Sequence, residues 1–367
     1  MAVVVTGANG FIGRNLSVRL AEIGWEVIGI GSDTGTAVLD EALSRAEFVF
    51  HLAGINRPTE TAEFHTGNVE VTRRLCERLA ATGRRIPLVY SSSIQAEINN
   101  PYGLSKRRAE EAIVDHARRT GSPVRIFRLA NVFGKWGRPN YNSAVATFCH
   151  NIARGLKINV SDPAARLSLL YVDDAVSAFL SLLETPWEGA EFAQADPVHE
   201  TTVGEVADMI RGFAASRSNL LTDRVGTGLT RALYSTYLSY LEPAAFAYEV
   251  PRHGDDRGVF VEMLKTPDCG QFSYFTAGPG ITRGEHYHHT KTEKFLVLTG
   301  EARFGFRHII TNERFEIVIR GGDGRIVETI PGWTHDITNI SDDEMVVMLW
   351  ASEIFDSARP DTIAEKV

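Results

Sequence analysis

Apolar and polar positions follow two different patterns along the first half of the chain, one typical of strands and one typical of helices. Short apolar runs, rich in β-branched residues and bounded by glycine or serine, are typical of buried strands. These runs are AVVVTG, EVIGIG, EFVFHLAG, PLVYSSS and VRIFRLANV. The segments between them, residues 11–24, 69–83 and 104–119, repeat apolar side chains with helical spacing. Because strands and helices alternate, this half predicts a parallel, doubly wound α/β sheet.

The pattern of apolar and polar positions changes after Pro243. Before it, residues 201–215 and Leu220–Tyr240 still have helical spacing and complete the first pattern. After it, short alternating segments are separated by glycine, proline, aspartate and asparagine, which is typical of an all-β sandwich or barrel. A chain of 367 residues is also too long for one ordinary hydrophobic core. We therefore expect two domains, residues 1–245 with the parallel sheet and residues 246–367 with the all-β fold.

Composition narrows the set of partners and locations. The formal net charge is -8 and the basic residues are scattered, so we expect no nucleic-acid partner and no membrane partner. The three cysteines, Cys76, Cys149 and Cys269, lie far apart without Cys-x-x-Cys spacing, which argues against a disulfide framework and a thiolate metal site. The N-terminus lacks a signal-peptide pattern, and no apolar run is long enough to cross a bilayer. We therefore expect a cytoplasmic protein.

A glycine-rich loop, Thr6–Gly13, joins the first expected strand to the first expected helix. Gly7 and Gly10 let the backbone turn tightly and approach a pyrophosphate, and Gly13 lets the helix pack close to the strand. The N-terminus of the helix then faces the negative charge of the phosphates. At this junction the motif predicts a dinucleotide site, and a purely structural turn is the alternative.

A tyrosine and a lysine four residues apart follow a strand that ends in Ser91–Ser93. Tyr102 and Lys106 would share one helical face, where the ammonium lowers the pKa of the phenol. Such a phenol can exchange a proton with a carbonyl or alcohol oxygen near neutral pH. A Tyr-x-x-x-Lys pair can also occur by chance, which is the alternative. The position of this pair after a strand that ends in serines argues against that alternative.

These motifs resemble the extended short-chain dehydrogenase/reductase family, a Rossmann-type fold, over residues 1 to about 240. The resemblance implies that Ser93 polarises the substrate oxygen, Tyr102 is the acid/base, and Lys106 holds the nicotinamide ribose. HLAG at residues 51–54 matches the strand beside the adenosine of the cofactor. The implied cofactor and sugar contacts are Gly7, Asn9, Gly10, Phe11, Ile12, Gly13, Leu52, Ala53, Gly54, Asn68, Tyr102, Lys106 and, toward the sugar, Asn131.

Two positions depart from patterns known in that family. The second strand ends Ile30-Gly31-Ser32-Asp33, without an acid at its immediate tip to hold the ribose diol of NAD, so we expect NADPH and keep NAD as the alternative. Ser93 is followed by Ile94-Gln95, where sugar dehydratases of the family have Asp-Glu. This difference argues against a dehydratase and leaves reduction or epimerisation.

A cluster of histidines opens the second half of the all-β pattern. Residues 280–300 follow Gly-x5-His-x-His-x4-Glu-x6-Gly, which selects His286, His288 and Glu293. The two histidines, two residues apart on a strand, point to the same face, and His335 in PGWTHDITN is a fourth candidate. Imidazoles with one carboxylate suit a divalent ion, and zinc fits this set. A solvated hairpin and a metal-free site with a histidine base are the alternatives.

The second domain resembles the metal-binding cupins, although Pro331 to His335 is one residue shorter than the usual second motif. Residues 255–262 are similar to the opening of cupin-fold epimerases that act on nucleotide 4-keto-6-deoxysugars. That similarity implies that Arg257 faces the nucleotide diphosphate, and a structural ion pair is the alternative.

Two longer stretches, residues 134–148 and 286–297, resemble the bifunctional reductases of the UDP-N-acetyl-L-fucosamine pathway, which make capsules and O-antigens. The resemblance implies a UDP-2-acetamido-2,6-dideoxy-β-L-arabino-4-hexulose substrate, epimerisation at carbon 3 and NADPH reduction at carbon 4 to a UDP-acetamido-6-deoxy-L-talose. It also implies bound zinc, a homodimer, and Lys135, Arg138 and Asn142 at the sugar and diphosphate. A nucleotide-sugar 4-epimerase whose cupin only dimerises and a non-catalytic dinucleotide-sensing regulator are the alternatives.

Overall fold

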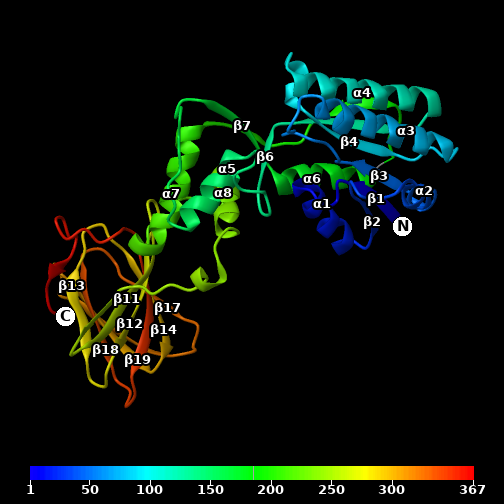
Figure 1. The fold of residues 1–367 in the computed structure, drawn as a ribbon. Helices are drawn as coiled ribbons and strands as arrows, with labels where there is room; N and C mark the ends of the chain where they lie inside the picture. The colour runs from blue at the N-terminus through cyan, green and yellow to red at the C-terminus, as the bar shows by residue number, and fades with distance from the viewer. Residues whose placement is uncertain (185) are drawn as a thin grey trace. The chain divides into compact units, whose positions relative to one another are not determined.

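The computed structural model describes residues 1–184 and 186–367, and the chain divides into two compact units (Figure 1). The first unit comprises Met1–Ile210 and Arg231–Leu241, and the second comprises Arg211–Thr230 and Glu242–Val367. The segment Arg211–Thr230 therefore belongs to the second unit, although the sequence pattern placed it in residues 1–245. Backbone pairing explains the difference, because the amide of Thr222 donates to Lys265 O at 2.8 Å and that of Lys265 donates to Leu220 O at 2.8 Å.

The first unit is built on a six-stranded sheet in which every neighbouring pair is parallel. In spatial order its strands are β2 (Glu26–Ile30), β1 (Ala2–Thr6), β3 (Phe48–His51), β4 (Leu88–Ser93), β5 (Val124–Leu129) and β8 (Ala190–Ala193). The side chains of β1 and β3 are buried throughout, as expected for strands covered on both faces. The expected parallel α/β sheet is confirmed.

Helices cover both faces of this sheet, with α3 packed on α4 and α1 packed on α6 (Figure 1). The long helix α4 begins at Asn100, whose side chain accepts from the amide of Gly103 at 2.7 Å, and ends at Gly121 with φ +71°. The helices are α1 (Phe11–Glu22), α2 (Thr36–Arg45), α3 (Val71–Ala81), α4 (Pro101–Thr120), α5 (Ala144–Ala153), α6 (Val172–Leu180), α7 (Val203–Asn219) and α8 (Gly228–Leu238). Shorter helical turns are η1 (His65–Glu70), η2 (Ile94–Glu97), η3 (Ser181–Leu183) and η4 (Pro243–Ala245).

The last strand expected in the first half is divided in the structure. After β5 the chain continues as β6 (Asn131–Phe133), which joins a separate sheet with β7 (Arg166–Tyr171) and β9 (Val198–Thr202). Asn131 therefore belongs to this separate sheet and not to the main one. Within Leu220–Tyr240, expected to be helical, only α8 is a helix. No helix among residues 1–184 and 186–367 is both long and apolar enough to span a membrane.

Within the second unit, residues 246–367 are all β, as expected, and their two antiparallel sheets share one apolar core. In spatial order, the first sheet contains β10 (Arg252–Asp255), β11 (Gly258–Thr266), β12 (Gly270–Ala277), β19 (Met345–Ala351), β14 (Glu293–Thr299) and β17 (Ile326–Glu328). The second sheet contains β16 (Arg314–Arg320), β15 (Glu301–His308), β18 (Trp333–Asn339), β13 (Thr282–Tyr287) and β20 (Ile363–Ala364). The core includes Phe275, Phe295 and Val347 from one sheet and Phe304 and Ile337 from the other.

Candidate active site and metal centre

The glycine-rich loop is shaped by close backbone contacts. Gly7 has φ +71°, and a Cβ added there would lie 2.8 Å from the backbone nitrogen of Ala53. A Cβ on Gly13 would lie 2.1 Å from Gly7 O. The loop is also held to the end of β2, because the amide of Gly7 donates to Ile30 O at 2.8 Å. Only glycine fits these positions, and the small loop lets a pyrophosphate approach its backbone and the start of α1 closely.

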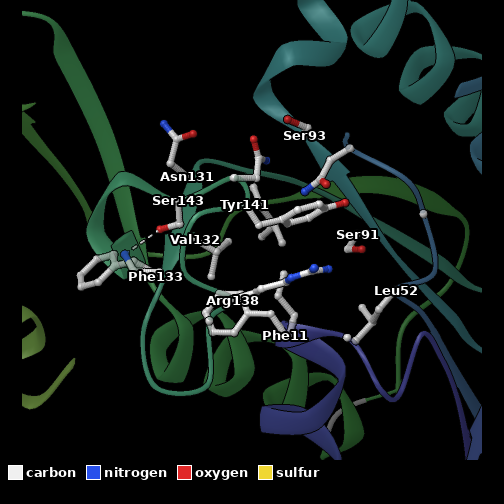
Figure 2. A pocket seen from close by; sticks show the side chains of 18 of the residues that line it. Phe11, Leu52, Ser91, Ser93, Asn131, Val132, Phe133, Arg138, Tyr141 and Ser143 are labelled. Carbon is white, nitrogen blue, oxygen red and sulfur yellow. Dashed lines mark hydrogen bonds between the residues drawn. The ribbon is translucent and has the colours of Figure 1, made fainter. Parts of the chain in front are cut away.

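A cavity of about 930 Å³ opens at the carboxyl ends of β1, β3, β4 and β5 (Figure 2). In a parallel sheet this edge is where ligands bind, because successive strands deliver their following loops to it. Most of the residues expected to bind cofactor or sugar line it. They are Gly7, Asn9, Gly10, Phe11, Ile12, Gly13, Leu52, Gly54, Asn68, Ser93, Tyr102, Lys106, Asn131, Arg138 and Asn142.

Ser93, Tyr102 and Lys106 come together at this cavity. Ser93 ends β4, whereas the other two lie in the first turns of α4. Burial raises the pKa of the Tyr102 phenol, and a hydrogen bond with Ser93 works in the opposite direction. We expected the pKa of Tyr102 to be lowered by Lys106. It is raised instead, because the phenol loses hydration on burial.

Lys106 is itself almost completely buried. Its Nζ donates to Ser91 O at 2.7 Å and lies 4.6 Å from the centre of the Tyr90 ring. Burial lowers the pKa of Lys106 to about 8, while Glu110 works in the opposite direction. The ammonium therefore remains mostly protonated at pH 7 and sits at a fixed place beside the cavity.

A buried carboxylate that the sequence did not single out fixes the catalytic helix. Glu110 is 3% exposed and follows Tyr102 and Lys106 at intervals of four residues, so all three share one face of α4. Arg128 of β5 donates to it from Nε at 3.0 Å and from Nη2 at 2.7 Å, and Ser92 donates its hydroxyl proton. This network ties α4 to the strands beside it. The repeat of four residues after Lys106 was the available sequence signal.

Asn68 holds the segment after β3. Its Oδ1 accepts from the amide of Ile55 at 2.8 Å, and its Nδ2 donates to Ile55 O and to Ser105 Oγ, each at 2.9 Å. It therefore shapes the cavity wall as well as lining it. Ala53, expected at the cofactor, does not line the cavity, because its amide donates to Thr6 Oγ1 at 3.2 Å.

The expected substrate residues have different outcomes. Figure 2 shows the side chains of Arg138 and Tyr141 in the cavity lining, where the guanidinium lies 4.9 Å from the ring centre. Lys135 does not line the cavity, since its ammonium forms an ion pair with Asp173 at the start of α6. Arg257, in the second unit, forms an ion pair with Asp255, which was the structural alternative for this residue.

Sequence reasoning missed two aromatic residues that line the cavity, Trp136 and Tyr141. Both belong to the loop between β6 and α5, in which Trp136 and Asn140 adopt left-handed backbone angles, with φ +67° and +54°. Such angles are unusual outside glycine and cluster at functional sites. Nothing in the sequence predicts them, although the aromatic residues could have been noted in an otherwise polar loop.

In the second unit, four side chains gather from three strands and one loop. They are His286, His288, Glu293 and His335, and one ligand atom from each lies within 4.8 Å of the others. The register of β13 and β18 places His286 directly opposite His335. A bulge at Gly284–His286, with φ +58° at Glu285, re-aims the end of β13. The structure therefore brings together the three residues that the spacing selected and the fourth candidate, His335.

The donor set fits a divalent cation. His286 Nε2 and His335 Nδ1 are buried without a hydrogen-bond partner among the residues described, and His335 Nε2 has only Glu293 Oε2 near it, at 3.4 Å. Leaving such a nitrogen unpaired costs about 1–3 kcal/mol each. Burial, followed by the proximity of His335, lowers the pKa of His286 to about 4, so its ring is neutral and keeps a lone pair. A bound cation would satisfy these atoms.

Glu293 supplies the negative charge of the cluster. Burial disfavours its charged form, but hydrogen bonding with His288 and the proximity of His335 outweigh burial and keep its pKa below the usual range. Glu293 Oε2 lies 3.2 Å from His288 Nε2. An ionised carboxylate among buried imidazoles is a suitable site for zinc or a similar ion.

Comparison with known proteins shows the family. The NAD dependent epimerase/dehydratase family matches residues 3–194, and the Polysaccharide biosynthesis C-terminal domain matches residues 253–363. The chain belongs to the NAD dependent epimerase/dehydratase family. The chain is therefore an enzyme, and its family uses a nicotinamide cofactor.

Two relatives match this chain along almost its whole length, and a third matches part of it. UDP-2-acetamido-2,6-beta-L-arabino-hexul-4-ose reductase of Pseudomonas aeruginosa is 56% identical over 365 residues, which are 99% of this chain and 98% of that protein. The solved structure of capsular polysaccharide assembling protein CapF from Staphylococcus aureus has 40% identity, covers 100% of both chains and gives a TM-score of 0.93. UDP-glucuronic acid 4-epimerase from Bacillus cereus in complex with NAD has 18% identity, covers 65% of this chain and 96% of that one, and gives a TM-score of 0.55, which supports the fold alone.

The loop geometry predicts a difference between two glycines that both have left-handed angles. We expect Gly7→Ala to weaken dinucleotide binding by more than about tenfold, because the added Cβ pushes the loop away from Ala53 and distorts the pyrophosphate site. Gly24, with φ +87° and open space around it, is the matched control. Gly24→Ala should lose only about 1–2 kcal/mol of stability and keep its affinity. Fluorescence titration with NADPH and NAD measures the affinity of both variants. Unchanged affinity in Gly7→Ala would contradict the proposed role of this loop in binding the pyrophosphate.

Proposed function

We propose that this chain is a bifunctional nucleotide-sugar enzyme of capsule or O-antigen biosynthesis. In this proposal the second unit epimerises carbon 3 of a UDP-2-acetamido-2,6-dideoxy-4-hexulose. The first unit then reduces the ketone at carbon 4 with NADPH to a UDP-2-acetamido-2,6-dideoxy-L-talose. The observation that carries the proposal is the 56% identity over 99% of the chain to a named 4-hexulose reductase. The convergence of Ser93, Tyr102 and Lys106 at one cavity supports the same chemistry.

The reductive step needs a proton donor beside the ketone oxygen. A reduced nicotinamide supplies hydride to the carbonyl carbon, and the oxygen that becomes an alkoxide must then be protonated. Tyr102 suits this task, because its raised pKa keeps the phenol protonated at neutral pH. Ser93, at the end of β4, would donate a hydrogen bond to the same oxygen, and the charged Lys106 would stabilise negative charge that develops on the phenol.

The epimerisation step uses the acidity of the carbon–hydrogen bonds next to a ketone. His286, His288, Glu293 and His335 would hold a divalent ion, which supplies a Lewis acid for the enolate oxygen. The buried imidazoles would contribute nitrogen lone pairs, and Glu293 would offset part of the positive charge. The enclosed position of these groups strengthens their electrostatic effect on the developing charge.

Cofactor choice, metal, assembly and location belong to the same proposal. No acidic side chain stands at the immediate end of β2, where NAD enzymes hold the ribose diol, so NADPH is the expected cofactor. Zinc is the expected metal, since three histidines and one glutamate match its preferences. The proposed assembly is a homodimer, and the reaction is placed in the cytoplasm, where UDP-sugars and reduced nicotinamides are available.

The central test separates the two steps with one substitution. Tyr102→Phe should reduce NADPH oxidation by at least about 10²-fold, because the alkoxide loses its proton donor. Exchange of the hydrogen beside the ketone with solvent deuterium should persist, since it occurs at the other unit. Tyr248→Phe, at an exposed tyrosine of the second unit, is the control and should retain both activities. Loss of deuterium exchange in Tyr102→Phe would contradict two separate sites.

The metal is tested without turnover. Protein purified without chelators should contain about one divalent ion per chain, because one cluster of four ligands is present among the described residues. His288→Ala should remove most of this metal, whereas His253→Ala, at an exposed histidine of β10, should retain it. Elemental analysis measures the content. Metal-free wild-type protein would overturn the metal proposal and favour a histidine acting as a base.

A further inference from the structure

The C-terminal segment, residues 361–367, lies along the strand that leads into the metal cluster. Its strand β20 pairs antiparallel with β13, so that Ala364 is opposite His286 and Ile363 is opposite Tyr287. The amide of Glu365 donates to Glu285 O at 2.9 Å and extends this pairing. The end of the chain is therefore a direct neighbour of the residues that carry the cluster.

One carboxylate of this segment holds the loop between β13 and β14. Asp361 Oδ1 accepts from the amide of His289 at 2.9 Å, and Oδ2 accepts from the amides of Thr290 at 2.7 Å and Lys291 at 2.8 Å. Oδ2 also accepts from the Thr290 hydroxyl at 3.0 Å. Three successive amides of the loop are thus tied to a single side chain. This loop connects His288 to Glu293, so its shape sets the distance between two cluster residues.

The backbone carbonyl of Asp361 makes a second contact, with Nδ1 of His288. His288 is 2% exposed, and its Nε2 faces the cluster 3.2 Å from Glu293 Oε2. A carbonyl oxygen can only accept, so Nδ1 of His288 carries a proton and Nε2 is the ring nitrogen turned toward the cluster. Partners of this kind fix the tautomer and orientation of histidines that bind metals.

The next residue acts on the buried ammonium beside the cluster. Thr362 Oγ1 accepts from Lys291 Nζ at 3.0 Å, and that Nζ lies 3.9 Å from Glu293 Oε1. Lys291 is only 7% exposed, so its direction is set by these neighbours. Asp361 therefore holds the backbone of the loop, and Thr362 orients the side chain of Lys291.

We propose that Asp361 is a positioning residue for the metal centre, acting from the C-terminal segment through His288 and the loop 289–291. The inference rests on the proposed metal site of the second unit. It assigns to the end of the chain a role in how tightly and how long a metal is held. Outer contacts of this type typically change metal affinity by about 10- to 100-fold when they are removed.

The test measures zinc itself. In Asp361→Ala, competition with a chromophoric chelator should show zinc affinity about 10- to 100-fold weaker than in the full-length wild-type protein, with faster zinc release. Asp356→Ala is the matched control. This exposed carboxylate lies five residues before Asp361 and, among the residues that the structure describes, contacts only the amide of Ala358 and the side chain of Arg359. The control should bind zinc as the wild type does. Asp361→Asn, which keeps one amide oxygen as an acceptor, should recover part of the affinity.

Two further readouts distinguish positioning from a general structural role. Cobalt(II) bound to Asp361→Ala should have a visible absorption spectrum different from the wild-type one. The variant lacks the carboxylate that ties loop 289–291 to the C-terminal segment and so keeps the Asp361 carbonyl against His288. The increase in melting temperature on adding zinc should shrink more than the melting temperature of the metal-free protein falls. If Asp361→Ala does not fold by circular dichroism, the isosteric Asp361→Asn decides by the same measurements.

The outcomes separate this inference from the proposed function. Wild-type protein without measurable zinc affinity would overturn the metal site and this inference with it. Zinc affinity, release rate and cobalt spectrum that are unchanged in Asp361→Ala would overturn this inference alone and leave the metal site standing.

Discussion

The first unit of this protein depends on one buried carboxylate. Glu110 accepts from Arg128 and Ser92 and thereby fixes α4 against β4 and β5. Breaking a buried ion pair of this kind by removing one partner typically costs about 3–5 kcal/mol, since an unpaired charge then remains inside. Because Tyr102 and Lys106 lie on the same face of α4, their position relative to Ser93 follows from this network. The positions of these residues are therefore set by a carboxylate that does not itself line the cavity.

The second unit reaches a comparable precision by strand register instead of a buried ion pair. The pairing of β13 with β18 places His286 opposite His335, and the start of β14 supplies Glu293. The remaining histidine, His288, lies beyond the strand, where no ladder holds it, and it is oriented by Asp361. Each unit thus positions polar groups in a buried environment, where unpaired groups are costly and paired ones are rigid.

The sequence predicted the parts that depend on local spacing. The roles of Gly7 and Gly13 can be predicted because no other residue fits their turns. The pairing of His286 with His288 can be predicted because side chains two residues apart on a strand share a face. The parts it missed depend on neighbours distant in the chain. The ion pair between Lys135 and Asp173 joins residues 38 positions apart, so local spacing does not show it. Burial, which depends on the whole fold, raises the pKa of Tyr102 where a lower pKa was expected.

The central claim is that one polypeptide inverts carbon 3 and reduces carbon 4 of the same ketosugar. The most direct measurement is the nuclear magnetic resonance spectrum of the product made in D₂O by the intact protein from the UDP-linked 4-ketosugar and NADPH. The account predicts solvent deuterium at carbon 3 with inverted configuration, cofactor hydrogen at carbon 4, and NADPH consumed in equal amount to the product. A product without deuterium at carbon 3, or one formed without net NADPH consumption, would contradict it.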